Sequence, residues 1–160
     1  GEQRIVGLSL NDFKLGGDLA NEIGNLRELR SLKVGGIGKV YKCPNSLINL
    51  RKLETLDVNF SDGTEWFLPN DMSSMLSLKV FKPAALKVPI ESFAGFYTLP
   101  ALEELNLSTM YLIGDLPTGI SKMKSLKSLS LAGTNIYSLP DDIGELAENL
   151  TAVPQGSPGS

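Results

Sequence analysis

Residues 102–126, LEELNLSTMYLIGDLPTGISKMKSL, contain the pattern that decides the fold. The alternation in Leu105-Asn106-Leu107 predicts a short β-strand with one face turned inward, because successive side chains of a strand point to opposite faces. The second half of the segment predicts a return of the chain to the start of the next strand. The apolar residues of the whole segment are Leu102, Leu105, Leu107, Leu112, Leu116, Ile120 and Met123.

The same apolar spacing recurs in six units of 23–25 residues that cover about residues 5–146. The third unit has one extra residue before Leu68, and the sixth unit is one residue shorter than the others. A single unit cannot bury its leucines, whereas stacked units bury them against each other and pair their strands. The sequence therefore predicts a solenoid whose strands are centred near Ser9, Lys33, Asp57, Lys82, Asn106 and Ser130.

Two segments resemble plant-type extracellular leucine-rich repeats, which have the pattern L-x-G-x-L/I-P. They are residues 112–117 (LIGDLP) with Ile120, and residues 15–19 (LGGDL) with residues 23–26 (IGNL). Such repeats occur in receptor-kinase ectodomains, and similar ones occur in protist surface antigens. The sixth unit, residues 129–136 (LSLAGTNI) followed by Leu139-Pro140, instead resembles repeats of intracellular plant immune receptors. The subclass stays open.

The resemblance to leucine-rich repeats implies an α/β solenoid with one curved parallel sheet, and with loops and short helical turns on the convex side. The open, concave face of the sheet is the surface that solenoids use for binding. One feature departs from the family pattern, because none of the six positions that follow the strands is the usual asparagine. We therefore expect backbone groups or water to satisfy these bends; the residues there are Phe13, Ile37, Ser61, Leu86, Met110 and Thr134.

Composition argues against several classes of function. The chain has no histidine and one cysteine, so it lacks the commonest general base, the commonest metal ligand and a disulfide framework. The net charge of −3 with mixed signs argues against a nucleic-acid partner. No apolar run is long enough to span a membrane, and no signal peptide opens the chain. We expect no catalytic residue, cofactor or metal, and no membrane insertion by this segment.

Several local motifs have a structural interpretation that outweighs a functional one. Residues 34–39 (VGGIGK) lack the first glycine and the hydroxyl of a phosphate-binding P-loop. Cys43 takes an apolar repeat position, which predicts a buried, inert thiol. The acidic pairs Glu103-Glu104 and Asp141-Asp142 are expected to be solvated surface charges. Phe67 is expected to fill the gap made by the inserted residue of unit three, whereas for Trp66 and Phe60 packing and exposure as an anchor are equally expected.

The ligand-binding face is predicted from the positions that alternate with the leucines. Charges at the first variable position of units two to six alternate in sign, which suggests a lateral ladder of ion pairs between neighbouring strands. Three N-x-[ST] sequons add candidate glycosylation sites at Asn59, Asn106 and Asn149. The predicted face consists of Arg30, Lys33, Glu54, Asp57, Phe60, Lys79, Lys82, Glu103, Asn106, Lys127 and Ser130.

The ends of the chain differ from its middle. Residues 1–150 are expected to form the repeat domain, and residues 151–160 (TAVPQGSPGS) a flexible tail. Neither end has a recognisable cap, which predicts a longer parent protein or self-association. The leading hypothesis is a module that binds a protein or peptide in a receptor-like or surface protein. The alternative is a structural module that self-associates through its sheet face or its ends. An extracellular or cell-surface location is favoured, with an intracellular one still open.

Overall fold

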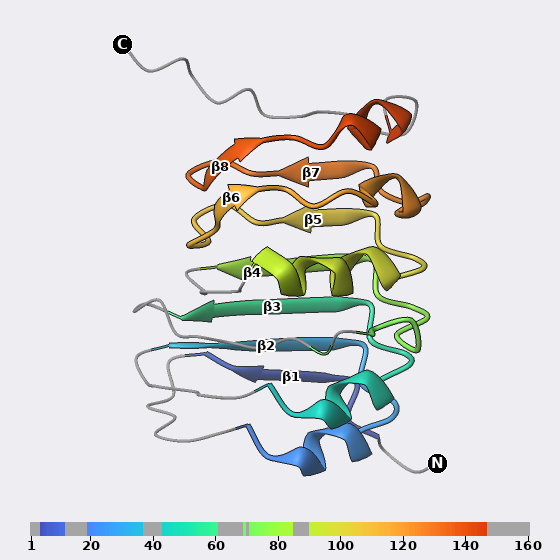
Figure 1. The fold of residues 1–160 in the computed structure, drawn as a ribbon. Coiled ribbons are helices and arrows are strands. Elements are labelled where there is room, and N and C mark those ends of the chain that lie inside the picture. The colour runs from blue at the N-terminus through green and yellow to red at the C-terminus, as the bar shows by residue number, and fades with distance from the viewer. Residues whose placement is uncertain are drawn as a thin grey trace.

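Six parallel strands stack into one sheet in this computed structural model (Figure 1), which describes residues 4–11, 19–36, 43–60, 69, 71–84 and 90–146. The strands follow one another in chain order, as expected for a solenoid, and each contains its predicted centre. They are β1 (Gly7–Leu10), β2 (Ser31–Gly36), β3 (Thr55–Phe60), β4 (Val80–Ala84), β5 (Glu104–Asn106) and β7 (Ser128–Ser130).

The register of the sheet equals the repeat length. Ser31 pairs with Thr55, Thr55 with Val80, and Val80 with Glu104, so the extra residue of unit three lies outside the strands. At the start of each main-sheet strand after β1, two backbone N–H groups donate to one carbonyl of the preceding unit. The carbonyl of Arg30, for example, accepts hydrogen bonds from the backbone N–H groups of Glu54 and Thr55 at 2.8 and 3.0 Å. The carbonyls of Val6, Glu54, Lys79 and Glu103 each accept two backbone hydrogen bonds in the same way.

Short 3₁₀ helices return the chain along the opposite side of the solenoid, as predicted. Their apolar residues are three positions apart, and a 3₁₀ helix has three residues per turn, so these side chains lie on one inward face. In unit two the carbonyl of Leu47 accepts from the N–H of Leu50, and that of Leu50 from Leu53. The helices are η1 (Asn21–Asn25), η2 (Asn45–Asn49), η3 (Ile90–Thr98), η4 (Ile120–Lys122) and η5 (Asp141–Leu146).

Unit four departs from the predicted spacing. The repeat pattern assigned the inward position to Ser92, but the structure buries Phe93 completely and leaves Ser92 half-buried. The helix η3 extends over nine residues, and it brings Phe93 within 4.7 Å of Phe96 between ring centroids. Phe96 also lies 5.4 Å from the ring of Phe81 in β4. An aromatic cluster thus replaces the single aliphatic residue that the other units use.

A second, two-stranded parallel sheet lies beyond the ends of β5 and β7, at the left of Figure 1. It pairs β6 (Ile113–Asp115) with β8 (Asn135–Ser138), so units five and six add a small sheet to the predicted six-stranded one, an addition that the repeat pattern did not predict. Both segments precede a Leu-Pro pair, and proline favours extended backbone in the residue before it. Because two neighbouring units are extended at the same place, their backbones pair.

The bends after β5 and β7 are closed by backbone groups, as the missing asparagines predicted. The N–H of Met110 donates to the carbonyl of Leu107 at 3.2 Å, and the N–H of Thr109 donates to the carbonyl of Ala132 at 3.0 Å. Thr134 donates from both its N–H and its hydroxyl to the carbonyl of Leu131. The four other bend positions, Phe13, Ile37, Ser61 and Leu86, lie outside the described residues.

Leucines of neighbouring units form one continuous core. Leu32, Leu56 and Leu105 are fully buried at the same position of β2, β3 and β5, and Phe81 holds that position in β4. Leu131 holds the same repeat position as the buried Leu107, but it is only partly buried and packs against the core. Pro83, which cannot donate to a strand ladder, lies in β4 two residues beyond the last pair with β5.

Replacement of Leu107 by alanine tests the core. We expect Leu107→Ala to lower the free energy of unfolding by about 2–4 kcal/mol, because it removes a fully buried side chain between two units. Leu131→Ala should cost clearly less, and Leu76→Ala, at a residue that is 58% exposed, should change stability by under about 0.5 kcal/mol. Denaturant unfolding measures all three, and equal losses at Leu107 and Leu76 would contradict the assigned core.

Candidate ligand-binding face

The six-stranded sheet presents an aligned column of side chains on the face opposite its core; we call this surface the open face. Within each strand the neighbours of these residues point inward; around Lys33, for example, Leu32 and Val34 are fully buried. All members of the column are exposed or half-buried. In chain order they are Ser9, Lys33, Asp57, Lys82, Asn106 and Ser130, the predicted strand centres.

Polar contacts link side chains of neighbouring strands across the open face. Lys82 forms an ion pair of 3.0 Å with Glu104, which shows that both side chains project from the same face of β4 and β5. Farther along, the hydroxyls of Ser108 and Ser130 lie 2.6 Å apart. The side-chain oxygen of Asn106 accepts a hydrogen bond from the N–H of Ser108 at 3.0 Å, which holds the amide close to the backbone. These contacts fix the orientation of side chains on the open face.

The charges predicted to alternate do pair, but at the edge of the sheet. Arg30 forms an ion pair with Glu54, and Lys127 forms one of 2.8 Å with Glu103, which confirms these two pairs of the ladder. The hydrogen bond from Lys127 lowers the pKa of Glu103, and the charge of Lys79 lowers it further. Each of these residues lies one position before a strand, so the column borders the open face and does not lie within it.

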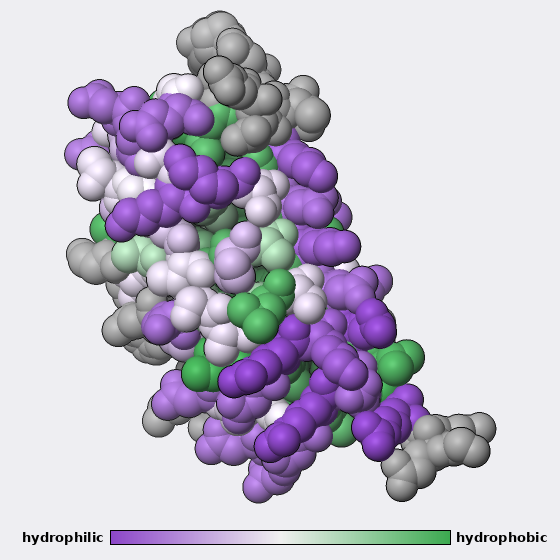
Figure 2. Space-filling view, turned by 90° about the vertical axis from the view of Figure 1, so that its right-hand side faces the viewer, coloured by the Kyte–Doolittle hydropathy of each residue, from purple (hydrophilic) through white to green (hydrophobic). Residues whose placement is uncertain are grey.

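A second chain of ion pairs runs along the same edge, and the sequence analysis missed it. Glu28 pairs with Lys52 at 2.7 Å and with Arg4 at 3.6 Å, and the hydrogen bond from Lys52 lowers the pKa of Glu28. These residues are 24 positions apart and alternate in sign, so the same comparison made two positions earlier in the repeat predicts them. Figure 2 shows the side of the molecule where the strands begin, with a hydrophilic band along its length.

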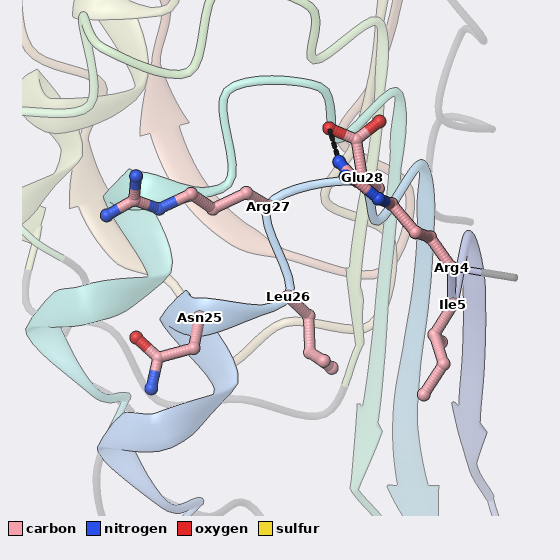
Figure 3. Close-up of a pocket in the computed structure, with 6 residues that line it drawn as sticks. All are labelled: Arg4, Ile5, Asn25, Leu26, Arg27 and Glu28. Atoms are coloured by element: carbon pink, nitrogen blue, oxygen red, sulfur yellow. Dashed lines mark ion pairs between the residues drawn. The ribbon is translucent and has the colours of Figure 1, made fainter. Parts of the chain in front are cut away.

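An open pocket of about 460 Å³ lies between β1 and η1. Figure 3 shows Ile5 and Leu26 projecting toward this space, with the ion pair between Arg4 and Glu28 at its rim. Arg4 and Glu28 at the rim are already paired with each other, and none of the lining residues belongs to the open face. We therefore do not assign the main site to it.

Comparison with known proteins supports the repeat architecture. No protein-family model matches the chain. A leucine-rich repeat protein of Leptospira interrogans superposes over 94% of this chain and 37% of its own, with a TM-score of 0.76 and 25% identity. The plant peptide hormone receptor RGFR1, in complex with RGF2, superposes over 92% of this chain and 24% of its own, with a TM-score of 0.72 and 25% identity. The chain has a leucine-rich repeat fold.

Among curated proteins, the TMV resistance protein N of Nicotiana glutinosa is 31% identical over 141 residues. That alignment covers 80% of this chain and 11% of the resistance protein. The leucine-rich repeat segment spans between 11% and 14% of the length of the curated relatives that it matches. These relatives include both resistance proteins and a receptor, in line with the mixed resemblance of its repeats.

Cys43 and Gly35, which the sequence analysis considered as possible functional residues, have structural roles in the leucine-rich repeat. Cys43 is buried, and burial raises the pKa of its thiol to about 12, which agrees with an inert cysteine. Gly35, from the P-loop-like segment, lies in β2, where an added Cβ would come within 2.5 Å of the carbonyl oxygen of Asn59. This glycine therefore serves close strand packing. The rest of that segment, residues 37–39, lies outside the described residues.

The remaining predicted positions differ in how much the structure says about them. Asn59 is exposed near the end of β3, and Asn106 is half-buried, so the two described sequons differ in access. Phe60 ends β3, but its side chain is not among those described. Trp66, Phe67, Asn149 and the predicted tail, residues 151–160, lie outside the described residues.

The described residues contain neither a candidate metal-binding group nor a candidate membrane-spanning helix. No group of three or more Cys, Asp or Glu side chains there could hold a metal ion. In the same part of the chain, no helix combines the length and apolar character needed to cross a bilayer.

The carboxylate of Asp142 positions the neighbouring unit, a role that the sequence analysis did not find. Its Oδ2 atom accepts hydrogen bonds from the N–H groups of Gly119 and Ser121 at 2.9 and 3.0 Å, at the start of η4. The bond from Ser121 is the main cause that lowers the pKa of Asp142. Asp141, beside it, is exposed. The signal in the sequence was weak because an acid at the start of a helix normally serves its own helix.

Acid should weaken the contact made by Asp142. A carboxylate whose pKa is lowered by folding stabilises the fold fully above its ordinary pKa of about 4, and that contribution disappears as pH falls through the lower folded value. We therefore expect Asp142→Asn to lower the melting temperature at neutral pH, and the gap to the wild type to shrink near pH 3. Asp141→Asn removes the same charge one residue away and is the control; a gap of equal size there would contradict the assigned role.

Proposed function

We propose that this leucine-rich repeat chain is a non-enzymatic module that binds a protein or peptide across its open face, as the recognition part of a larger receptor-like protein. One observation carries the proposal. The register of the sheet aligns partly exposed polar side chains in columns over a fully buried core. Such a surface is rigid and offers varied chemistry, while the core beneath it is insensitive to changes in the outward residues.

The electrostatics of the face favour recognition by shape and local hydrogen bonds. Positive and negative side chains alternate from strand to strand, as in Lys33, Asp57 and Lys82, and Lys82 is paired with Glu104. Alternating charges leave no extended field of one sign, so long-range steering of a charged ligand is weak. A ligand of mixed polarity with an extended backbone fits such a face better than a strongly charged polymer.

Similar structures support the same class of ligand. The similar receptor RGFR1 is described in complex with RGF2 and is named a peptide hormone receptor. This chain covers 24% of that receptor, so the similarity supports peptide or protein binding as a class and leaves the identity of the ligand to experiment.

A charge-reversed face tests the proposal. Lys33 and Asp57 are directly paired in the sheet, so the double variant Lys33→Glu, Asp57→Arg keeps their attraction and the net charge while it changes the surface. We expect proteins captured by the wild-type chain from an extract, and identified by mass spectrometry, to be lost with this variant. Affinity for a purified partner should fall at least about tenfold.

The matched control reverses two charges on the returning segments. Glu22 and Lys124 are exposed there, and Glu22→Arg with Lys124→Glu should leave partner binding unchanged. Wild-type binding should also weaken less than about tenfold between low and physiological salt. If every captured protein binds both double variants equally, the open face is not the binding surface.

Self-association is a second candidate function, favoured by apolar side chains at the edge of β1. Ile5 and Val6 are 55% and 53% exposed, and Leu8 and Leu26 are only partly buried. Size-exclusion chromatography with light scattering measures this directly. If β1 is a contact, the wild-type chain should form oligomers and Ile5→Ser with Val6→Ser should be monomeric. A monomeric wild type at high concentration would exclude it.

A further inference from the structure

A separate apolar surface lies on the small sheet of β6 and β8. Of seven large apolar side chains that are exposed in the described residues, four belong to this region. We call them the flank patch. They are Tyr111, Ile113, Tyr137 and Leu139, which are 52%, 59%, 75% and 46% exposed.

The pairing of β6 with β8 brings the residues of the flank patch close together. Tyr111 and Ile113 are two residues apart at the start of the β6 segment, and Tyr137 and Leu139 are two residues apart at the end of the β8 segment, so both rows belong to the two paired segments. Ile113 pairs with Asn135 and Gly114 with Ile136, which sets the two rows side by side. Ile136 is the residue of β8 that packs against the core, and the neighbouring Tyr137 stays exposed to solvent.

Negative charge accompanies these apolar groups. Asp115, two residues after Ile113, is exposed, and its carboxylate accepts a hydrogen bond from the hydroxyl of Ser138, the residue after Tyr137, at 2.6 Å. Asp141 lies two residues after Leu139 and is also exposed. Within residues 4–11, 19–36, 43–60, 69, 71–84 and 90–146, neither carboxylate forms an ion pair. The ion pairs there join residues before or within the strands of the main sheet.

The two edges of the solenoid are therefore chemically different. At the edge where the main strands begin, acids and bases neutralise each other and the surface is hydrophilic (Figure 2). At the edge where they end, aromatic and aliphatic side chains stand beside acids without a basic partner among the described residues. A surface that combines tyrosines, an apolar centre and unneutralised carboxylates is complementary to a polypeptide with basic and apolar residues.

We propose that the flank patch docks a basic, partly apolar segment of a partner protein, as a second contact that does not depend on the open face. A lysine or arginine of the partner reaches Asp115 or Asp141, and its alkyl stem lies along Tyr137. Apolar side chains of the same segment cover Tyr111 and Ile113. A second copy of this chain fits poorly, because a symmetric contact would bring the carboxylates of Asp115 and Asp141 toward those of the other copy. Anionic lipid is repelled for the same reason.

A displayed peptide library tests both the place and the chemistry of this contact. Random peptides of about twelve residues are selected on the wild-type chain and then on the double variant Ile113→Ser, Tyr137→Ser. We expect a class of peptides that carries lysine or arginine beside apolar residues, binds the wild type, and loses at least about tenfold in affinity on the double variant. Asp115→Asn should weaken the same peptides, because it removes the charge and keeps the shape.

Matched controls separate this contact from general stickiness and from the open face. Leu76→Ser changes a side chain as exposed as Ile113, at 58% against 59%, on another part of the surface, and it should leave the peptides bound. Lys33→Glu with Asp57→Arg alters the open face and should also leave them bound. Thermal melts of all variants should match the wild type, since every substituted side chain is at least partly exposed.

Amide chemical shifts locate the bound peptide independently. Titration of the ¹⁵N-labelled chain with a selected peptide should shift the signals of Gly114, Asn135 and Tyr137 and leave those of β2 and β3 in place. Selected peptides without basic residues, shifts confined to the open face, concentration-dependent dimerisation through the patch, or no enrichment at all would each overturn the proposal. Failure at the flank patch leaves the open-face variants of the proposed function free to succeed or fail separately.

Discussion

Every other feature of this molecule depends on the burial of each unit's leucines against the next unit at a constant register. A unit of about 24 residues exposes its apolar side chains when alone, so it gains stability only by stacking. The backbone enforces the same step, because one carbonyl before each strand accepts two N–H groups from the following unit. Side chains at equivalent positions are then neighbours, and any pattern with the repeat period becomes a column on the surface.

This constraint explains why the strands were predictable and why the small sheet was not. The alternation of apolar and polar residues in Leu105-Asn106-Leu107 predicts a strand, and the equivalent positions of the other units predict the remaining strands. The pairing of β6 with β8 needs extended backbone at the same place in two successive units, and residues 112–117 and 135–140 differ in sequence. Phe93 was missed for a related reason, since a long η3 shifts the inward position by one residue.

The candidate site was predictable where it follows the repeat period and not where it depends on the path of the chain. The pairing of Arg30 with Glu54 follows from opposite charges 24 residues apart. This column borders the open face because its residues come just before the strands begin. The alternation of apolar and polar residues alone does not determine where a strand begins. Asp142 holds the start of η4 in the unit before it, a contact set by how two returning segments approach each other.

The distribution of charge gives the two surfaces different physical characters. Ion pairs around the open face suit a ligand that is recognised by shape. Because these charges cancel, we expect only weak long-range attraction of a charged ligand to this face. The flank patch keeps its carboxylates without a described basic partner beside exposed tyrosines, so a cation that arrives there gains a charge contact and an aromatic surface together. The open face and the flank patch belong to different sheets, so the two proposed contacts do not compete for the same side chains.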